Sequence, residues 1–344
     1  MGYRFYASYI STKIYSLQDF TGDVPAKEFQ DGIDFVPTKK EILFGHHFTS
    51  IAGAAPIIGP CIAAFWGWLP AMLWIVFGTI FMGAVHDFGA LVVSVREKGK
   101  TIADITGTII NKRVKTMFLI FVMMLSWLVL AVFSMAIAGL FVSIPTAVLP
   151  VNIEIIIALA VGFLLYRKKV DALIPSIIAL ILLYVFVYIG SFTPLSFEGL
   201  GMDKASQSTL WIILLFIYSG IASLLPVWLL LQPRDYINSH QLIVGLVLIF
   251  MGIAIAQPVV EAPMIRSAGE GVPSLFPLLF VTIACGAISG FHGLIASGTT
   301  SKQVSNIQDT KMIGYRSMLG EGTLALASTI AAVAGISLVT NCNL

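Results

Sequence analysis

The stretch GHHFTSIAGAAPIIGP, residues 45–60, decides the fold of this chain. It begins a long apolar run, yet it contains two histidines, two hydroxyl side chains, three glycines and two prolines. The apolar flanks indicate a membrane segment, while the glycines and prolines predict that its helix is interrupted. Irregular backbone at membrane depth is stable only where protein or a water-filled cavity satisfies its amide and carbonyl groups. The stretch is therefore a candidate binding site.

Composition places the chain among the polytopic helical membrane proteins. Hydrophobic residues make up 58% of its 344 residues and charged residues 11%, whereas a typical soluble domain carries about 25% charged residues. Basic residues lie in short loops rather than on one stripe, so we expect no nucleic-acid partner. The cysteines Cys61, Cys285 and Cys342 are widely separated and show no CxxC spacing. The sequence therefore predicts neither a disulfide framework nor a zinc ribbon, and we assign no metal or cofactor.

The chain has two segments of different polarity. Residues 1–45 form the only long polar stretch, and we expect an ordered surface segment here, whose first residues are the end of a preceding span. Residues 46–340 contain nine apolar runs, most of them long enough for the roughly 20 residues that a membrane span requires. The runs are residues 46–66, 68–95, 115–143, 149–166, 171–191, 208–231, 240–257, 274–298 and 313–340, and the first, sixth and eighth are interrupted.

The basic residues test this layout independently. If the nine spans alternate, all but two of the 20 Lys and Arg residues fall on the side that carries residues 1–45. The opposite side receives only Lys204 and Arg266. Cytoplasmic loops of membrane proteins are enriched in Lys and Arg. The distribution therefore predicts nine crossings, with residues 1–45 in the cytoplasm.

Six ionisable side chains are predicted to lie within the spans. Such residues are rare in spans, and by default they face a cavity or a partner and mark a pathway. Asp87 comes nine residues before Arg96, which places it ~14 Å from the cytoplasmic edge at ~1.5 Å per residue. Histidine titrates near neutral pH, so histidines beside buried carboxyl groups can form a proton relay. The candidates for proton coupling are His46, His47, His86, Asp87, His292 and Glu321.

Each of these candidates also has a structural interpretation. His46 and His47 could cap the start of a helix, and Asp87 could pair with His86 or with a backbone donor. His292 could be a core histidine whose hydrogen bonds are satisfied, and Glu321 could extend to the membrane interface.

The interrupted segments supply the candidates for substrate binding. Ser, Thr, Gly and Pro at this density unwind helices, and the exposed N–H groups of a half-helix start can bind a carboxylate. Close helix contact through small residues is the structural alternative. Arg234 and Asp235, just beyond the sixth run, are either a cytoplasmic gate or a positive-inside anchor. The substrate-binding candidates are Thr49, Ser50, Gly53, Pro56, Gly59, Ser219, Ser223, Pro226, Ser289, Ser297, Thr299 and Thr300.

Five motifs resemble the carbon starvation protein A (CstA) family. They are GHHFTSIAGAAPIIGP (45–60), GAVHDF (83–88), SLLPVWLLLQPRDY (223–236), FPLLFVTIACGAISGFHGLIASGTTSKQ (276–303) and IGYRSMLGEG (313–322). The resemblance covers about residues 1–340. It implies an all-α inner-membrane transporter of the five-plus-five inverted-repeat type, which takes up peptides under carbon limitation or pyruvate together with protons. Family members have additional spans before and after this region, which implies missing spans or a partner subunit here.

Three functions follow as hypotheses. The leading one is a secondary transporter that imports a small carboxylate-bearing solute, pyruvate or short peptides, driven by protons. The second is a non-transporting sensor or subunit that needs a partner. The third is an intramembrane metal-dependent enzyme, which we do not expect because the sequence contains no HExxH or comparable metal-ligand spacing.

Overall fold

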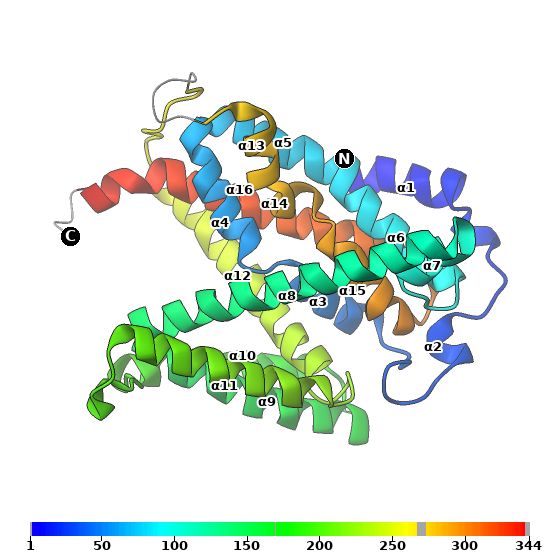
Figure 1. Cartoon of the computed structure of the whole chain (residues 1–344), viewed down its shortest axis with the longest axis horizontal. Helices are drawn as coiled ribbons and strands as arrows, with labels where there is room; N and C mark the ends of the chain where they lie inside the picture. The colour runs from blue at the N-terminus through cyan, green and yellow to red at the C-terminus, as the bar shows by residue number, and fades with distance from the viewer. Residues whose placement is uncertain (1, 169, 267–272, 341–344) are drawn as a thin grey trace. The chain divides into compact units, whose positions relative to one another are not determined.

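The computed structural model describes residues 2–168, 170–266 and 273–340, and within these residues the regular structure is helical (Figure 1). The predicted all-α membrane bundle is thus confirmed, whereas its inverted repeat stays a prediction. The chain divides into two compact units. Unit 1 comprises Met1–Asp31, Phe35–Ile102 and Asn238–Leu344, and unit 2 comprises Gly32–Asp34 and Ala103–Ile237. Cys342 and Lys169 lie outside the described residues.

Seven helices of the described chain are long and apolar enough to cross a membrane. They cover Trp68–Arg96, Lys112–Ser143, Pro145–Arg167, Leu173–Phe192, Lys204–Ser223, Leu231–Ala256 and Ile307–Ala334. An eighth candidate is the pair α3 (Lys40–Ile51) and α4 (Ala55–Ala63), which meet at a bend of 47°. The predicted run 274–298 folds instead as three short helices, so the count of nine crossings stays a prediction.

The elements of each unit follow the chain order. Unit 1 begins with η1 (Gly2–Tyr6), α1 (Ala7–Tyr9), η2 (Ile10–Ile14), η3 (Leu17–Asp19) and α2 (Pro25–Glu28). After α3 and α4 come η4 (Ala64–Trp66), α5 (Trp68–Gly78), η5 (Thr79–Gly83) and α6 (Ala84–Arg96). Its last part contains α13 (Leu275–Thr282), α14 (Ala284–Ile288), α15 (Phe291–Gly298), η8 (Thr300–Lys302), η9 (Ile307–Asp309), η10 (Lys311–Arg316) and α16 (Ser317–Thr340).

Unit 2 contains the helices α8 (Lys112–Ser143), η6 (Pro145–Ala147), α9 (Val148–Arg167), α10 (Leu173–Phe192), η7 (Glu198–Leu200) and α11 (Lys204–Ser223). Two helices, α7 (Ile102–Ile109) and α12 (Leu231–Ala256), belong partly to each unit. Within unit 2, α9 packs against α10, and α8 packs against α11. The side chains of α8 are largely exposed, as expected for a helix whose apolar surface contacts lipid.

The predicted break in the first run is present between α3 and α4. The helix α3 ends at Ile51, and Ala52 leaves the helical conformation. Pro56 then occupies the first turn of α4, where the missing N–H of proline costs no hydrogen bond. A side chain could not be placed on Gly59, because its Cβ would lie 2.4 Å from the carbonyl oxygen of Thr282. The small residues of the opening stretch therefore both interrupt the helix and let it pack closely.

The sixth predicted run differs from the prediction. The helix α11 ends at Ser223, and the segment from Leu224 to Leu230 connects it to α12. Pro226 lies in this connection, where a proline disrupts no interior helical hydrogen bond. The break at residues 219–226 is therefore the junction of two helices rather than an interruption within one span.

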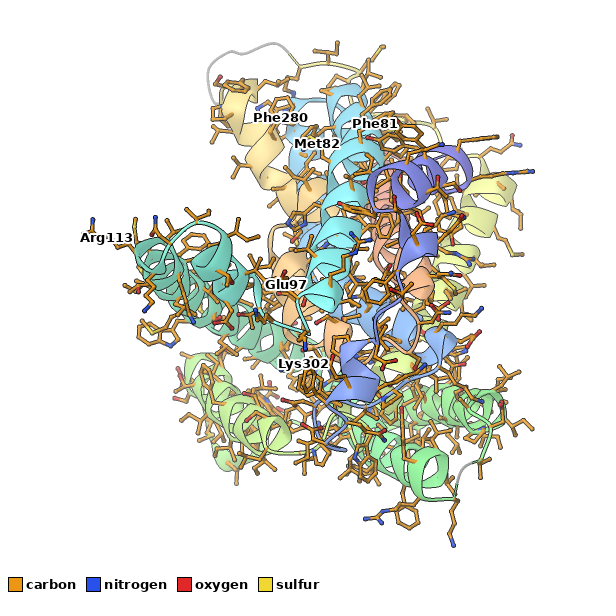
Figure 2. All side chains as sticks on the ribbon, turned by 90° about the vertical axis from the view of Figure 1, so that its right-hand side faces the viewer. Phe81, Met82, Glu97, Arg113, Phe280 and Lys302 are labelled. Carbon is orange, nitrogen blue, oxygen red and sulfur yellow. The ribbon has the colours of Figure 1, made fainter. Side chains whose placement is uncertain are left out.

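The core of unit 1 joins segments that are far apart in the sequence. Phe88 and Leu91 of α6 pack in one buried cluster with Tyr315 of η10 and with Ile10 of the N-terminal segment. Figure 2 shows Glu97 and Lys302 toward one end of this unit, and Phe81, Met82 and Phe280 toward the other.

Candidate functional site

A buried histidine of unit 1 lies between two buried carboxylates. His292 of α15 contacts Asp87 of α6 through Nδ1 and Oδ2 at 2.8 Å, which is a hydrogen bond. Its other ring nitrogen, Nε2, lies 3.0 Å from Oε2 of Glu321 on α16. That second contact has the distance of an ion pair but lacks the geometry of a hydrogen bond. All three side chains are fully buried, so three helices contribute one ionisable group each to a single point.

A fourth residue connects this group to a more accessible region. His86 Nδ1 lies 3.0 Å from Oδ1 of Asp87, and the His86 side chain is 42% exposed. The Asp87 carboxylate therefore contacts two imidazoles, one through each oxygen. We call His86, Asp87, His292 and Glu321 the His292 cluster. Each of these groups can bind a proton, and neighbouring groups lie 2.8 or 3.0 Å apart.

The local sequence explains why the three helices meet here. Both α6 and α16 follow a π-helical turn, η5 and η10, and π-turns occur frequently at functional sites. The helix α15 begins only after a break at Ser289 and Gly290. Gly293 lets α15 approach α6 closely, since a Cβ there would lie 3.1 Å from Cε1 of His86. Each of the three helices therefore begins next to irregular backbone.

A second buried contact joins the opening stretch to the segment after α15. His47 Nδ1 lies 2.9 Å from the hydroxyl of Thr300, and both side chains are fully buried. His46, the preceding residue, is also buried. The structure therefore connects two of the predicted residues, His47 and Thr300, that are 253 positions apart.

Hydroxyl groups of the same region make structural hydrogen bonds. Ser297 donates to the carbonyl of Gly293 at 2.7 Å and accepts from the amide of Ile102 at 3.2 Å. Ser94 lies 2.9 Å from the hydroxyl of Ser301. The sequence prediction included Ser297 but neither Ser94 nor Ser301.

The remaining candidates of unit 1 lie around the helix breaks. Thr49 lies on an open groove of about 380 Å³, together with Asn238 and Gln241 of α12, two polar residues that the sequence prediction missed. Ser289 lies buried between α14 and α15. Of the others, Ser50, Gly53 and Thr299 are half-buried, and Pro56 and Gly59 are buried in α4.

The candidates of unit 2 are not part of the His292 cluster. Ser223 donates to the carbonyl of Gly220 in its own helix at 2.8 Å. Ser219 lies four residues earlier on α11, and Pro226 lies in the connection to α12. Arg234 pairs with its neighbour Asp235 at 2.9 Å and contacts the Tyr218 hydroxyl at 3.4 Å. The predicted gate residues thus form an ion pair with each other.

Cys285 is a further residue that the sequence prediction missed. One ligand atom each from Cys285, His292 and Glu321 lies within 4.8 Å of the other two, so this group could hold a metal ion. Closely spaced cysteines would have indicated a metal site in the sequence, whereas this group combines three residue types on three helices. Cys285 and His292 are seven residues apart in the sequence, but the break at Ser289 and Gly290 separates their helices, so helical spacing gives no signal for the pair.

Comparisons with known proteins agree with the resemblance of the motifs. The family model described as carbon starvation protein CstA matches residues 1–341. The peptide transporter CstA of Campylobacter jejuni is 37% identical over 339 residues, which cover 96% of this chain and 48% of that protein. The peptide transporter CstA of Helicobacter pylori strain 26695 is 36% identical over 338 residues, or 96% of this chain and 49% of that protein.

A relative with a different name matches the same region. The pyruvate/proton symporter BtsT of Escherichia coli is 35% identical over 338 residues, which cover 96% of this chain and 47% of that protein. The chain therefore spans about half the length of these curated relatives. No solved structure matches.

Proposed function

The chain belongs to the carbon starvation protein CstA family, and from this premise we propose that it carries the proton-coupling part of a secondary transporter. The proposed substrate is a small solute with a carboxylate group, either a short peptide or pyruvate. The proposed location is the inner membrane, with residues 1–45 and the Arg234–Asp235 pair on the cytoplasmic side. Relatives named as peptide transporters and as a pyruvate/proton symporter support this class of function.

The observation that carries the proposal is the contact of His292 with two buried carboxylates. If the imidazole is protonated and both carboxylates are ionised, the three groups have a net charge of −1. One additional proton makes them neutral. A net charge within a bilayer costs several kcal/mol unless it is paired. The group is therefore suited to take up a proton when it is closed to water and to release one when it is open.

His86 provides the proposed path for that proton. Its side chain is partly exposed, while its Nδ1 contacts the Asp87 carboxylate. A proton can therefore pass from His86 to Asp87 across the 3.0 Å contact. When the protonated His292 receives it at Nδ1 across the 2.8 Å contact, its Nε2 proton goes to Glu321, 3.0 Å away, so that the carboxylate of Glu321 becomes neutral. His47, with its contact to Thr300, is the proposed second proton-binding position of the region, with His46 beside it.

The helix breaks are the proposed substrate contacts. Short peptides and pyruvate share a carboxylate group, and the amides of irregular backbone at membrane depth are suitable donors for it. In the break between α3 and α4 the amides of Ala52 and Gly53 already donate to the carbonyls of Phe48 and Ile51. The proposed donors are therefore the amide of Ala54 and the hydroxyl of Thr49, which lies on the adjoining groove. Asn238 and Gln241 add side-chain amides to the same groove.

Uptake into proteoliposomes tests the proposal. We expect an inward proton gradient to drive accumulation of labelled pyruvate or of a labelled dipeptide. His292→Gln keeps a hydrogen-bonding side chain but cannot bind a proton, so it should reduce accumulation to the level without a gradient. His240→Gln is the matched control, because His240 of α12 is not in the His292 cluster. Equal accumulation by the two variants would contradict the proposed role of His292.

A further inference from the structure

Three side chains of unit 1 form a set of metal-ligating groups. Cys285 comes from α14, His292 from α15 and Glu321 from α16, and their ligand atoms lie within 4.8 Å of one another. His292 and Glu321 are fully buried, and Cys285 is half-buried. Neighbouring ligands of a tetrahedral zinc-type ion are about 3.3–3.6 Å apart, given metal bonds of about 2.0–2.3 Å. The pair of Nε2 and Oε2 lies at 3.0 Å, and ligand atoms at the 4.8 Å limit reach the tetrahedral spacing after a shift of roughly 1 Å.

The hydrogen bonds around His292 point its free nitrogen at the other two groups. Asp87 occupies Nδ1 at 2.8 Å, and Nε2 faces Glu321 at 3.0 Å. A histidine that binds a metal nearly always uses one nitrogen for the ion and gives the other N–H to a carboxylate or carbonyl. Asp87 therefore acts as a positioning residue, and His86 in turn contacts Asp87.

Unpartnered polar atoms support a ligand at this point. His292 Nε2 and both carboxylate oxygens of Glu321 are buried without a hydrogen-bond partner among the described residues. Nε2 and Oε2 contact each other at 3.0 Å as an ion pair, so Oε1 of Glu321 is the atom with neither a hydrogen bond nor an ion-pair contact. Buried polar atoms are hydrogen-bonded in the great majority of cases, so this group requires an explanation. A divalent cation satisfies all three and is balanced by the charges of one carboxylate and one thiolate.

We propose that Cys285, His292 and Glu321 bind one divalent transition-metal ion of the zinc type. A sulfur, a nitrogen and an oxygen ligand together favour this class over Mg²⁺ and Ca²⁺, which take oxygen ligands. Three protein ligands leave a fourth coordination position for water or an anionic group. The alternative is that Cys285 is a packing residue whose thiol only contacts the Ser289 hydroxyl, 3.6 Å away.

The ion and the proposed proton relay use the same atoms. A metal ion bound to Nε2 of His292 and to Glu321 excludes protons from both groups. Occupancy therefore blocks proton coupling, and the ion acts as an inhibitor of uptake. Metal binding itself does not depend on transport and can be measured on the purified chain.

Titration of the purified chain with Co²⁺ tests the site. In a Cys342→Ser background, we expect one Co²⁺ per chain, with a thiolate-to-cobalt charge-transfer band that Zn²⁺ removes. Cys285→Ala should lose this band. Cys61→Ala is the matched control and should keep it, because the Cys61 thiol instead contacts the Ser328 hydroxyl at 3.1 Å.

A positioning variant separates ligation from a general effect on folding. Asp87→Asn should keep the thiolate band but weaken Co²⁺ binding by about 10–100-fold, as is typical when a group that orients a ligand is changed. Elution volume and thermal unfolding confirm that each variant is folded. The proposal is overturned if the parent chain binds no stoichiometric Co²⁺, or if Cys285→Ala and Cys61→Ala give the same spectrum and affinity.

Discussion

Replacing Asp87 by asparagine changes the charge of the His292 cluster with little change in shape. The carboxylate accepts contacts from two imidazoles, His86 and His292, at 3.0 and 2.8 Å. Asparagine offers only one oxygen, and its NH₂ group faces the second imidazole as a donor. Hydrogen bonds to a charged group contribute about 1.5–3 kcal/mol each and neutral ones about 0.5–1.5 kcal/mol. Two such exchanges therefore reduce the free energy of unfolding by about 2–3 kcal/mol.

The functional effect of Asp87→Asn should be larger than this loss of stability. The variant removes one of the three groups that exchange the proton, so we expect gradient-driven accumulation to fall to the level without a gradient. The assay is uptake into proteoliposomes, with equal reconstitution verified for each protein. Thermal unfolding in detergent measures the change in stability.

A matched control uses the same substitution at an exposed ion pair. Asp104 contacts Lys115 at 2.6 Å, and the two side chains are 42% and 40% exposed. Exposed pairs contribute about 0–1 kcal/mol, so Asp104→Asn should change stability little and leave accumulation intact. Unchanged accumulation in Asp87→Asn, or a loss of stability no larger than in Asp104→Asn, would refute this reasoning.

Two further predictions concern packing and metal inhibition. Gly83→Ala should destabilise the protein by about 1–3 kcal/mol in thermal unfolding, because the new Cβ would lie 2.3 Å from the Ala287 carbonyl oxygen. Gly139→Ala is the control and should be neutral or stabilising, because its new Cβ would have no atom within 4 Å. Equal changes in stability for the two variants would contradict this packing. Zn²⁺ should inhibit proton-driven uptake by the parent protein and by Cys61→Ala, whereas uptake by Cys285→Ala should resist inhibition. Equal inhibition of the two variants would show that the inhibitory ion binds at another site.

Much of the fold follows from simple sequence patterns. Apolar runs and the Gly and Pro content of residues 45–60 predict a helical membrane protein with an interruption in this stretch, and the structure places the break after Ile51. The end of α11 at Ser223 was not predicted, because the apolar run continues through the connection to Leu230. Hydropathy shows which residues are apolar, but it does not show where a helix such as α11 ends.

The site was predictable by residue type but not by pairing. Asp87, His292 and Glu321 are ionisable groups in apolar surroundings, which is a strong signal in a single sequence. Their contacts with one another were not predictable, because they depend on how α6, α15 and α16 pack. His292 and Asp87, for example, are 205 positions apart in the sequence. Cys285 shows the opposite case, because an isolated cysteine in an apolar helix is indistinguishable from a packing residue until its neighbours are known.

The most direct test of proton coupling is the pH inside the vesicles during uptake. A pH-sensitive dye enclosed in proteoliposomes reports whether protons enter when pyruvate or a dipeptide is added outside. The account predicts acidification of the lumen on addition of the transported substrate, and none with His292→Gln. Substrate uptake without acidification would contradict the account, because it would show that solute moves without the proton that the His292 cluster is proposed to carry.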